Sequence, residues 1–378
     1  MDVSVVCPDL SHNCLGRAHL LGSLIERNFS VEIIGPQMGA SIWEPVEDEF
    51  EYVSIESSNR ATSLPSLARR FLSKAEGNVL YVSKPRPTSY GVALLLKLLD
   101  DRMTILDIDD WESGLCRRST TIRTYLYSSL QLGKLHSFYW VQAMERLSGL
   151  ADAVTVSNTF LRDRFGGDII PHVRDTDSFD PDKYNPRKAR LEYGIPPEKT
   201  IVMFSGTPRP HKGVEELIKA VTSCSEDIVG VIVGVTESDY HKRLREEAGD
   251  RVMIFGQQPF EELPKWLATA DIVAIPQRET SNAVGQIPAK VFDAMAMAKP
   301  IIATDVSDLS QILDGCGLVI QPGDTAALRE AIQCLHDNAD LRHRLGDSAR
   351  ERCVRKYSYD ATAPKIASIV NPLLHNNR

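Results

Sequence analysis

The clearest chemical pattern in the sequence is a pair of cations in a turn of small residues, FSGTPRPHKG at residues 204–213. An apolar run ends at Ser205, and Lys212 directly precedes a helix predicted over residues 213–223. Arg209 and Lys212 would then lie beside free backbone N–H groups and the positive end of a helix dipole. Both side chain types hold phosphate oxygens. The sequence therefore indicates a phosphate site, and a solvated turn whose cations face water is the alternative.

A second pattern, GQIPAKVFDAMAMAKPIIAT at residues 285–304, could complete that site. Pro288 suits the first position of a helix, so the amides of Ala289 and Lys290 would point out of its N-terminus. Asp293 follows about one turn later, where one carboxylate can accept hydrogen bonds from the two hydroxyl groups of a ribose. The alternative is that Asp293 only complements the helix dipole, with the Met/Ala run forming helix core.

A third pattern, Asp107-Ile108-Asp109-Asp110-Trp111, follows an apolar run. Paired carboxylates suit hard cations, and the D-x-D spacing resembles the metal-binding carboxylates of GT-A transferases and of phosphatases with an aspartate nucleophile. However, alternate residues at a strand end point to opposite sides, and Trp111 stands where those phosphatases need Ser, Thr or Val. Metal binding, capping of the next helix, and contact with a sugar acceptor all stay open for this cluster.

The elements that must position these residues are short apolar runs alternating with helical patterns. Runs without polar alternation, separated by helices, predict parallel sheets covered on both faces. The predicted strands are 3–7, 30–34, 79–82, 104–108 and 153–156, and then 200–205, 228–233, 251–255, 272–275, 301–303 and 318–320. The predicted helices include 18–27, 64–74, 91–99, 120–150, 213–223, 259–269, 289–298 and 360–374.

The predicted architecture is two doubly wound α/β domains that face each other across a cleft. We place the first domain at residues 1–174, a proline-rich and charged linker at 175–199, and the second domain at 200–359. We keep open the option that the last segment, residues 360–378, packs back on the first domain. Ligands of such sheets bind at the carboxyl ends of the strands.

Composition limits the classes of protein that this chain can be. The 378 residues are 43% hydrophobic and 25% charged with a net charge of −8, which is typical of globular domains and lacks the overall basic charge of nucleic-acid binders. Seven scattered cysteines without a CxxC pair predict neither a zinc knuckle nor a disulfide framework. The start MDVSVVCPDL reads as a strand, and no apolar stretch approaches the ~20 residues of a membrane span. We therefore expect a cytoplasmic protein, with peripheral docking at the inner membrane face left open.

Taken together, the ordered segments GTPRPHKG, ADIVAIPQ and GQIPAKVFDAMAMAKPIIAT resemble the donor domain of GT-B nucleotide-sugar glycosyltransferases, specifically the retaining family 4 (glycosyl transferases group 1). IPHVRD at 170–175 and SNTFL at 157–161 resemble two further elements of that family. The resemblance extends over most of the chain and is densest over residues 150–310.

The resemblance implies roles for individual residues. Lys212 would neutralise the diphosphate leaving group. The family's arginine position falls at or near Thr207, so Arg209 is expected to supply that cation from a shifted place. Asp293 takes the place of the glutamate that holds the ribose hydroxyls. The other expected donor contacts are the amides of Ala289 and Lys290, the loop residues Gly206 and Thr207, Gly16 near the phosphates, and Gln257 near the base.

Two departures from the family pattern concern acidic residues. The family has two glutamates eight positions apart, and here those positions hold Gly285 and Asp293. Glu279 or Asn282 is expected to compensate from the same loop. A histidine often follows the fourth strand of the first domain, and Asp109 is nearest to that position, so we count it as a catalytic candidate.

The function implied by the resemblance is hexosyl transfer from a nucleoside-diphosphate-sugar, with UDP or GDP expected as the nucleotide and no metal or cofactor required. The acceptor would be a hydroxyl of a glycan, a lipid-linked sugar or a small molecule, and the anomeric configuration would be retained. A nucleotide-sugar epimerase on the same scaffold, or a non-catalytic sugar-nucleotide-binding partner subunit, are the alternatives. An aromatic and basic stretch at 117–150 suits a lipid-linked or polyphosphate acceptor, or simply packs on the sheet.

Overall fold

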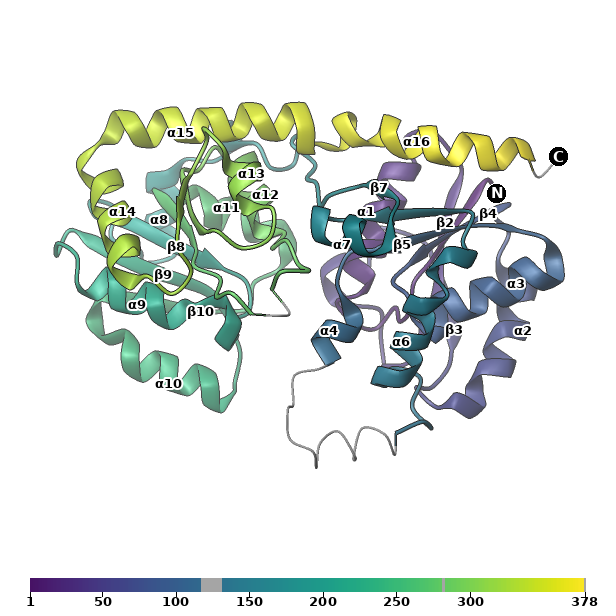
Figure 1. The fold of residues 1–378 in the computed structure, drawn as a ribbon. Coiled ribbons are helices and arrows are strands. Elements are labelled where there is room, and N and C mark those ends of the chain that lie inside the picture. Colours follow the sequence, from purple (N-terminus) through teal and green to yellow (C-terminus); the bar gives the residue numbers. More distant parts are fainter. Residues whose placement is uncertain (117–130, 281–282, 377–378) are drawn as a thin grey trace. The chain divides into compact units, whose positions relative to one another are not determined.

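The computed structural model describes residues 1–116, 131–280 and 283–376, and its chain divides into two compact units. Unit 1 comprises residues 1–171 and the chain from 362 onward, and unit 2 comprises residues 172–361. Figure 1 shows the elements of each unit by label. The C-terminal residues thus group with the first unit, whereas the expected linker at 175–199 lies wholly within unit 2.

Unit 1 is built on a seven-stranded parallel sheet in the order β3-β2-β1-β4-β5-β6-β7. The five strands predicted for this unit are all present. Two further strands, β3 and β7, lie at the edges of the sheet and were not predicted. The first is only partly buried, and the second has two residues. The strands are β1 Val3–Val6, β2 Val31–Gln37, β3 Tyr52–Glu56, β4 Val79–Ser83, β5 Met103–Ile108, β6 Ala153–Val156 and β7 Asp168–Ile169.

The helices of unit 1 flank this sheet and bury one apolar face each. In α2, Leu67, Ala68 and Phe71 point into the core while the charged residues face outward. This helical spacing of apolar residues is the pattern that predicted the helix. Of the long helix predicted at 120–150, the described part is α-helical only over α6, with a 3₁₀ turn at Ser148–Leu150, and residues 117–130 lie outside the described chain. The helices are α1 Leu15–Ile25, α2 Leu64–Lys74, α3 Val92–Asp100, α4 Glu112–Cys116, α6 Phe138–Arg146, α7 Thr159–Phe165 and the last helix, α16 Tyr359–Asn376.

Unit 2 repeats the arrangement with a six-stranded parallel sheet in the order β10-β9-β8-β11-β12-β13. All of its strands were predicted to within two residues, because each is a short apolar run. The four inner strands are buried almost throughout, and the two edge strands are partly exposed. The strands are β8 Thr200–Ser205, β9 Ile228–Val235, β10 Val252–Gly256, β11 Ile272–Ile275, β12 Ile301–Thr304 and β13 Leu318–Ile320.

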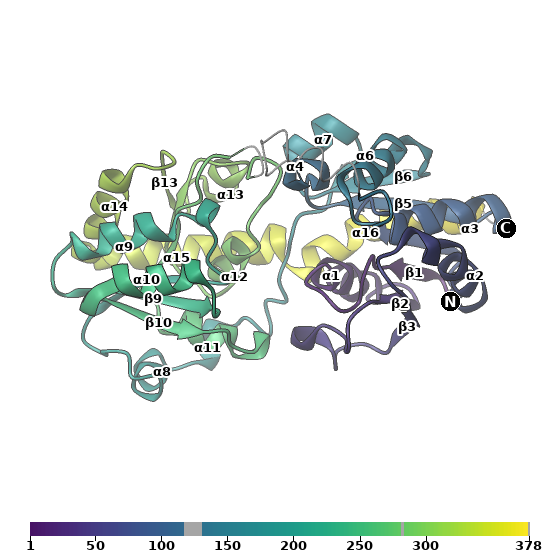
Figure 2. The ribbon, with the colours of Figure 1, turned by 90° about the horizontal axis from the view of Figure 1, so that it is seen from below.

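Two apolar cores lie on opposite faces of this second sheet. Ile201 and Met203 belong to one core, and Val202 and Phe204 belong to the other, as the alternation of side chains along a strand requires. Figure 2 shows helices on both sides of the strands. The helices are α8 Pro186–Glu192, α9 Val214–Thr222, α10 Asp239–Ala248, α11 Leu263–Ala268, α12 Lys290–Ala296, α13 Leu309–Leu313, α14 Thr325–Asp337 and α15 Ala339–Arg352.

Residues 175–199 are packed into unit 2, contrary to the expected linker. Phe179 and Ile195 are buried in one of its two cores. Arg190 donates to the carbonyl oxygen of Thr269 at 2.8 Å and to the carboxylate of Asp271 at 2.7 Å. The proline and charge content indicated a linker, but a few apolar anchors and one buried arginine are enough to fasten such a segment.

Strand order reverses between β1 and β4 in unit 1 and between β8 and β11 in unit 2. At such a switch point, neighbouring loops leave the sheet in opposite directions and open a ligand crevice. The loops at each switch point touch: Thr88 Oγ1 donates to Pro8 O at 2.8 Å in unit 1, and Arg278 N donates to His211 O at 2.8 Å in unit 2. The patterns at 204–213 and 285–304 therefore follow the two strands at the reversal in unit 2, whereas the acidic cluster follows β5, the neighbour of β4 in unit 1.

Candidate functional site

The loop after β8 is held in a conformation that only glycine adopts easily. Gly206 and Gly213, at its two ends, have φ of +100° and +67°. A Cβ on Gly213 would lie 1.8 Å from the carbonyl oxygen of Pro276, so this glycine lets the loop after β8 meet the loop after β11. The two sequence patterns of unit 2 are therefore neighbours in space.

Lys212 is the cation that this loop positions. It ends the short 3₁₀ helix Pro210–Lys212, and its Nζ donates to the carbonyl oxygen of Thr207 at 2.8 Å. Burial, and then the charge of Arg209, lower the pKa of Lys212 to about 8. Arg209 itself is exposed. The alternative of a turn whose cations merely face water therefore describes Arg209 but not Lys212.

The sequence reasoning missed His241, which holds the same loop from α10. The imidazole is buried, and its Nε2 lies 3.0 Å from Pro208 O. Its Nδ1 lies 2.9 Å from the backbone nitrogen of Thr236. If Nδ1 accepts from that N–H, Nε2 carries the proton and donates to the loop. A histidine in a charged helix gives no signal of this role, because the contact depends on how α10 packs.

Lys290 reaches the same loop from the start of α12. Its Nζ lies 3.5 Å from the centroid of the Phe204 ring, and a Cβ on Gly206 would be 3.3 Å from it. The amine is buried and has no hydrogen-bond partner among the described residues. Burial, and then the charge of Lys212, lower the pKa of Lys290 well below its ordinary value. The expectation for this residue concerned its backbone amide, and the side chain lies at the site as well.

Asp293 has a partner that the sequence did not reveal. Its side chain is 4% exposed, and Oδ1 accepts a hydrogen bond from Nε of Arg174. Arg174 is buried and also lies 5.6 Å from the Phe260 ring centroid. The carboxylate raises the pKa of Arg174, although burial alone would lower it. Asp293 therefore acts first as the counter-ion of a buried arginine, and only its second oxygen is left for another ligand.

The remaining residues expected in unit 2 are placed as follows. Gln257 follows β10 and is exposed, and Glu279 is exposed on the loop after β11. Asn282 lies outside the described residues. Gln277, on the same loop, is buried, and its Nε2 has no hydrogen-bond partner among the described residues. A buried amide donor without a partner is unusual, and sequence alone does not distinguish Gln277 from Gln257.

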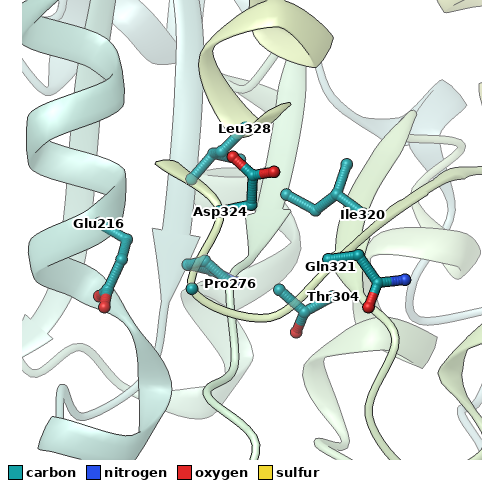
Figure 3. A pocket seen from close by; sticks show the side chains of 8 residues that line it. Glu216, Pro276, Thr304, Ile320, Gln321, Asp324 and Leu328 are labelled. Atoms are coloured by element: carbon teal, nitrogen blue, oxygen red, sulfur yellow. The ribbon is translucent and has the colours of Figure 1, made fainter. Parts of the chain in front are cut away.

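A small hollow of about 170 Å³, open to solvent, lies near this loop on unit 2 (Figure 3). It contains none of the residues that the sequence predicted for the site. Its walls come from the ends of β12 and β13 and from α9 and α14, with Glu216, Thr304, Gln321 and Asp324 as polar residues. Two carboxylates make this hollow unsuitable for an anion.

In unit 1 the acidic cluster after β5 is occupied by cations of the protein. Asp107 is fully buried and accepts from Nε and Nη2 of Arg17 at 2.9 and 2.8 Å. Asp109 is 5% exposed and accepts from Nζ of Lys84 at 2.7 Å. Because the two side chains bind different cations, they do not form the paired-oxygen site that the metal-binding alternative requires. Within the described residues, no three His, Cys, Asp or Glu side chains gather as metal ligands.

Lys84 is the centre of a compact ion network at the switch point of unit 1. Its Nζ also lies 2.8 Å from Asp110 and 3.1 Å from Glu112, and Arg86 lies 2.7 Å from Glu112. Although burial opposes it, the charges of Lys84 and Arg86 lower the pKa of Glu112 to about 2. Because Asp109 is held by Lys84, its carboxylate is better suited to positioning a ligand than to transferring a proton.

Gly16 lies in the first turn of α1, beneath the ring of Trp43. A Cβ at this position would be 3.2 Å from that ring. The close contact with Trp43 therefore explains why residue 16 is a glycine, without any role in phosphate binding.

Comparisons with known proteins agree with the predicted resemblance. Residues 198–338 match the family model described as Glycosyl transferases group 1. The chain is 30% identical over 203 residues to a D-inositol 3-phosphate glycosyltransferase of Corynebacterium glutamicum, covering 50% of this chain and 47% of that one. It is 29% identical over 193 residues to the alpha-D-kanosaminyltransferase of Streptomyces kanamyceticus, covering 48% of each. The chain thus spans about half the length of the curated relatives it matches.

Solved structures match along the whole chain. Sucrose-phosphate synthase of Thermosynechococcus elongatus superposes with a TM-score of 0.73 at 17% identity, covering 100% of both chains. The Anabaena protein HepE, in complex with UDP, gives 0.77 at 15% identity and covers 98% of this chain and 100% of its own. The predicted GT-B fold class is confirmed, and the group 1 resemblance is confirmed over residues 198–338. None of the described helices is long and apolar enough to cross a membrane.

Proposed function

We propose that this chain is a glycosyltransferase that moves a sugar from a nucleoside-diphosphate-sugar to a hydroxyl group of an acceptor. The observation that carries the proposal is the cationic loop after β8, with Lys212 and Lys290 at the switch point of unit 2. It lies inside the segment that matches the group 1 model. HepE, a protein of similar fold, binds UDP, which makes UDP the first nucleotide to test and GDP the second.

In the proposed reaction the bond between the anomeric carbon and the diphosphate oxygen breaks, and a bond to the acceptor oxygen forms. Negative charge develops on the leaving diphosphate, whose oxygen takes up the proton that the acceptor hydroxyl loses. Lys212 and Arg209 would stabilise that charge, together with the amides of Thr207, Ala289 and Lys290. The amide of Gly206 is not among these donors, because it donates to the carbonyl oxygen of Val233 at 2.8 Å. Such groups can be supplied by the protein alone, so we propose a reaction that needs no metal ion. Retention of configuration is proposed from the resemblance to family 4.

The nucleoside would be held by weaker contacts in the same unit. We propose that the second carboxylate oxygen of Asp293 accepts from one ribose hydroxyl, since Arg174 already occupies the first. Gln257 is proposed to lie beside the base, and Glu279 or Asn282 to replace the missing first glutamate. For unit 1 we propose that Asp109, fixed by Lys84, positions the acceptor.

The test is turnover with a panel of donors and acceptors. Purified protein is incubated with UDP- and GDP-sugars and with acceptors chosen from the relatives' names, such as inositol 3-phosphate and phosphatidyl-myo-inositol. Release of nucleoside diphosphate together with a glycosylated product is the expected result, and it should survive EDTA. An epimerised donor without acceptor would favour the epimerase, and tight UDP binding without turnover would favour a non-catalytic subunit.

Peripheral membrane contact is proposed for unit 1. Leu98 and Leu99 on α3 are 81% and 69% exposed, and Leu150, whose carbonyl accepts from Lys97 at 3.0 Å, is 53% exposed. Because Lys97 is paired with Asp152 at 2.6 Å, the proposed contact rests on the exposed leucines, which suit the interfacial region of a bilayer. We expect the protein to float with vesicles containing phosphatidylglycerol, and Leu98→Asp to abolish this. Equal flotation of both proteins would contradict the proposal.

A further inference from the structure

Lys290 is one of several described residues of unit 2 whose buried polar atom has no hydrogen-bond partner, and among these it is the one whose group can carry a positive charge. A buried ammonium group without a hydrogen bond is costly, because the protein does not replace the water it loses. Lys290 has that position: its Nζ is buried 3.5 Å from the centroid of the Phe204 ring, and a Cβ on Gly206 would lie 3.3 Å from it. The aromatic face offers some cation–π attraction, but Phe is not the best ring for it.

Lys299, only nine positions later, shows how unit 2 accommodates another buried lysine. Its Nζ donates to the carbonyl oxygens of Ala268 and Ala270, at 3.2 and 2.9 Å. Burial lowers its pKa to about 8, in the same direction as for Lys290. The difference between the two residues is therefore the missing partner at Lys290, and not burial as such.

The charges around Lys290 do not neutralise it. Lys212, from the loop after β8, is close enough to lower the pKa of Lys290 further. Asp293, one turn along α12, acts in the opposite sense, but its carboxylate is bound to Arg174. The amines of Lys212 and Lys290 are thus neighbours near Gly206. The groups that act on Lys290 include no protein anion that is free to pair with it. A ligand with two or more negative charges would satisfy both.

We propose that the Lys290 amine is a direct ligand of the donor diphosphate, and that it takes up a proton from solvent when the diphosphate binds. This rests on the proposed function and adds a proton-linked residue to it. In the free protein, burial and the charge of Lys212 favour the neutral amine, which limits the cost of burying it. When the diphosphate arrives, an –NH₂ group and a solvent proton become –NH₃⁺ hydrogen-bonded to phosphate oxygen. Binding is then coupled to pH through one residue.

Calorimetric titration of the full chain with UDP tests the coupling. Measured near neutral pH in buffers with different ionisation enthalpies, the observed enthalpy should vary with the buffer, and the sign of the slope should show proton uptake. Lys212, with a pKa of about 8, is already mostly protonated there and contributes little. Uridine should bind without proton uptake, whereas pyrophosphate should show it.

Lys290→Met keeps the volume of the side chain and removes the amine. It should abolish the proton uptake and weaken UDP binding by tenfold or more, because a hydrogen bond between charged groups is lost. It should also raise the thermal midpoint of the ligand-free protein, since no protein group loses a partner. The matched control is Lys299→Met, which should leave the proton uptake intact and lower the midpoint, because two buried carbonyls lose their donor.

The outcomes separate the inference from the proposed function. If UDP binds wild type and Lys290→Met equally, or if the proton uptake persists in the variant, the inference is wrong while the proposed function stands. If pyrophosphate binds with proton uptake but neither UDP nor GDP does, the anion site is correct and the nucleotide donor is wrong. If none of the three binds, both proposals fail.

Discussion

At the scale of single residues, unit 2 concentrates its unusual electrostatics on three side chains: Lys212, Lys290 and Asp293. Burial lowers the pKa of both lysines, and the charge of Arg209 acts in the same direction on Lys212, as does that of Lys212 on Lys290. Asp293, by contrast, is committed to Arg174. Perturbed groups gathered at a sheet's switch point are typical of a functional site.

The first prediction concerns Lys212. Lys212→Ala should fold, because a loop cation carries little core packing, and should lose about 10²–10³-fold in rate, as when one transition-state donor is removed. Since the pKa of Lys212 is about 8, kcat/KM of wild type should fall as pH rises through about 8. Lys212→Arg should keep its charge and remove that fall. Near-wild-type turnover of Lys212→Ala would exclude the diphosphate role, and Arg209→Ala should be similar or milder.

The lowered pKa of Lys212 also determines in which direction the stability of the protein changes with pH. The folded pKa of about 8 lies below the ordinary 10.5, so between these values the unfolded chain binds more protons than the folded one. The free energy of unfolding contributed by Lys212 therefore rises with pH across this window. Below about pH 8 the cost of burying the charge is present in full. Lys212→Met removes that cost together with the hydrogen bond to Thr207 O, so any gain in stability of the ligand-free protein should be smaller than for Lys290→Met.

The second prediction concerns the Asp293–Arg174 ion pair. Asp293→Asn leaves a buried guanidinium without its counter-ion, so the free energy of unfolding should fall by about 3–5 kcal/mol. Replacing both partners, Asp293→Leu with Arg174→Met, should recover much of that loss. Chemical denaturation of the two variants beside wild type measures both changes.

A second readout on the same variant tests the ribose contact. Asp293→Asn should weaken UDP binding more than binding of an analogue that lacks both ribose hydroxyls. Equal weakening of both ligands would mean that Asp293 has only its structural role.

At the scale of elements, the site depends on two loops that belong to different strands. The loop after β8 supplies Lys212, and the loop after β11 leads to Lys290. Their meeting point is Gly213, where a left-handed backbone and a close approach to Pro276 coincide. The loops are held further by Arg278 N, which donates to His211 O at 2.8 Å.

The third prediction tests that meeting point. Gly213→Ala adds both a strained φ and a collision with backbone, whereas Gly194→Ala, at φ +68°, adds a methyl group with nothing within 4 Å. The control should cost about 1–2 kcal/mol of unfolding free energy, as is usual for a left-handed residue with a side chain. Gly213→Ala should cost at least twice as much and should also weaken UDP binding. Similar denaturation midpoints for the two variants would mean that the loops are not coupled there.

At the scale of the whole molecule, the chain forms two units that each have their own parallel sheet and core. Six strands follow the same order in both, β3-β2-β1-β4-β5-β6 and β10-β9-β8-β11-β12-β13. Unit 2 is one continuous stretch, residues 172–361, whereas unit 1 is completed by the end of the chain. All of the proposed nucleotide contacts except that of Gly16 lie in unit 2.

The fourth prediction follows from this division. Residues 172–361, expressed alone, should fold cooperatively, because both faces of their sheet are covered by their own helices. The fragment should bind UDP, and UDP at about 100 times its dissociation constant should stabilise it by roughly 2.7 kcal/mol. Circular dichroism melts with and without UDP measure both effects. A fragment that folds but does not respond to UDP would move the nucleotide site out of unit 2.

The sequence by itself determined the two parallel sheets and the main features of the anion loop. Buried parallel strands such as β8 and β11 are uninterrupted apolar runs, and the helix α2 has one apolar stripe, so local pattern suffices for them. The loop residues Gly206, Lys212 and Gly213 are recognisable for the same reason, because they lie together in the chain.

Only the tertiary structure decided which charges meet. Arg174 is far from Asp293 in sequence, Lys84 is far from Asp109, and His241 is far from the loop it holds. Nothing local encodes these pairs, since each depends on how separate elements pack. The same holds for the edge strand β3, which forms because a sheet edge was open to it, and for residues 175–199, whose few apolar anchors find a core only once unit 2 exists. A buried ion pair is a property of the environment, and the environment exists only after folding.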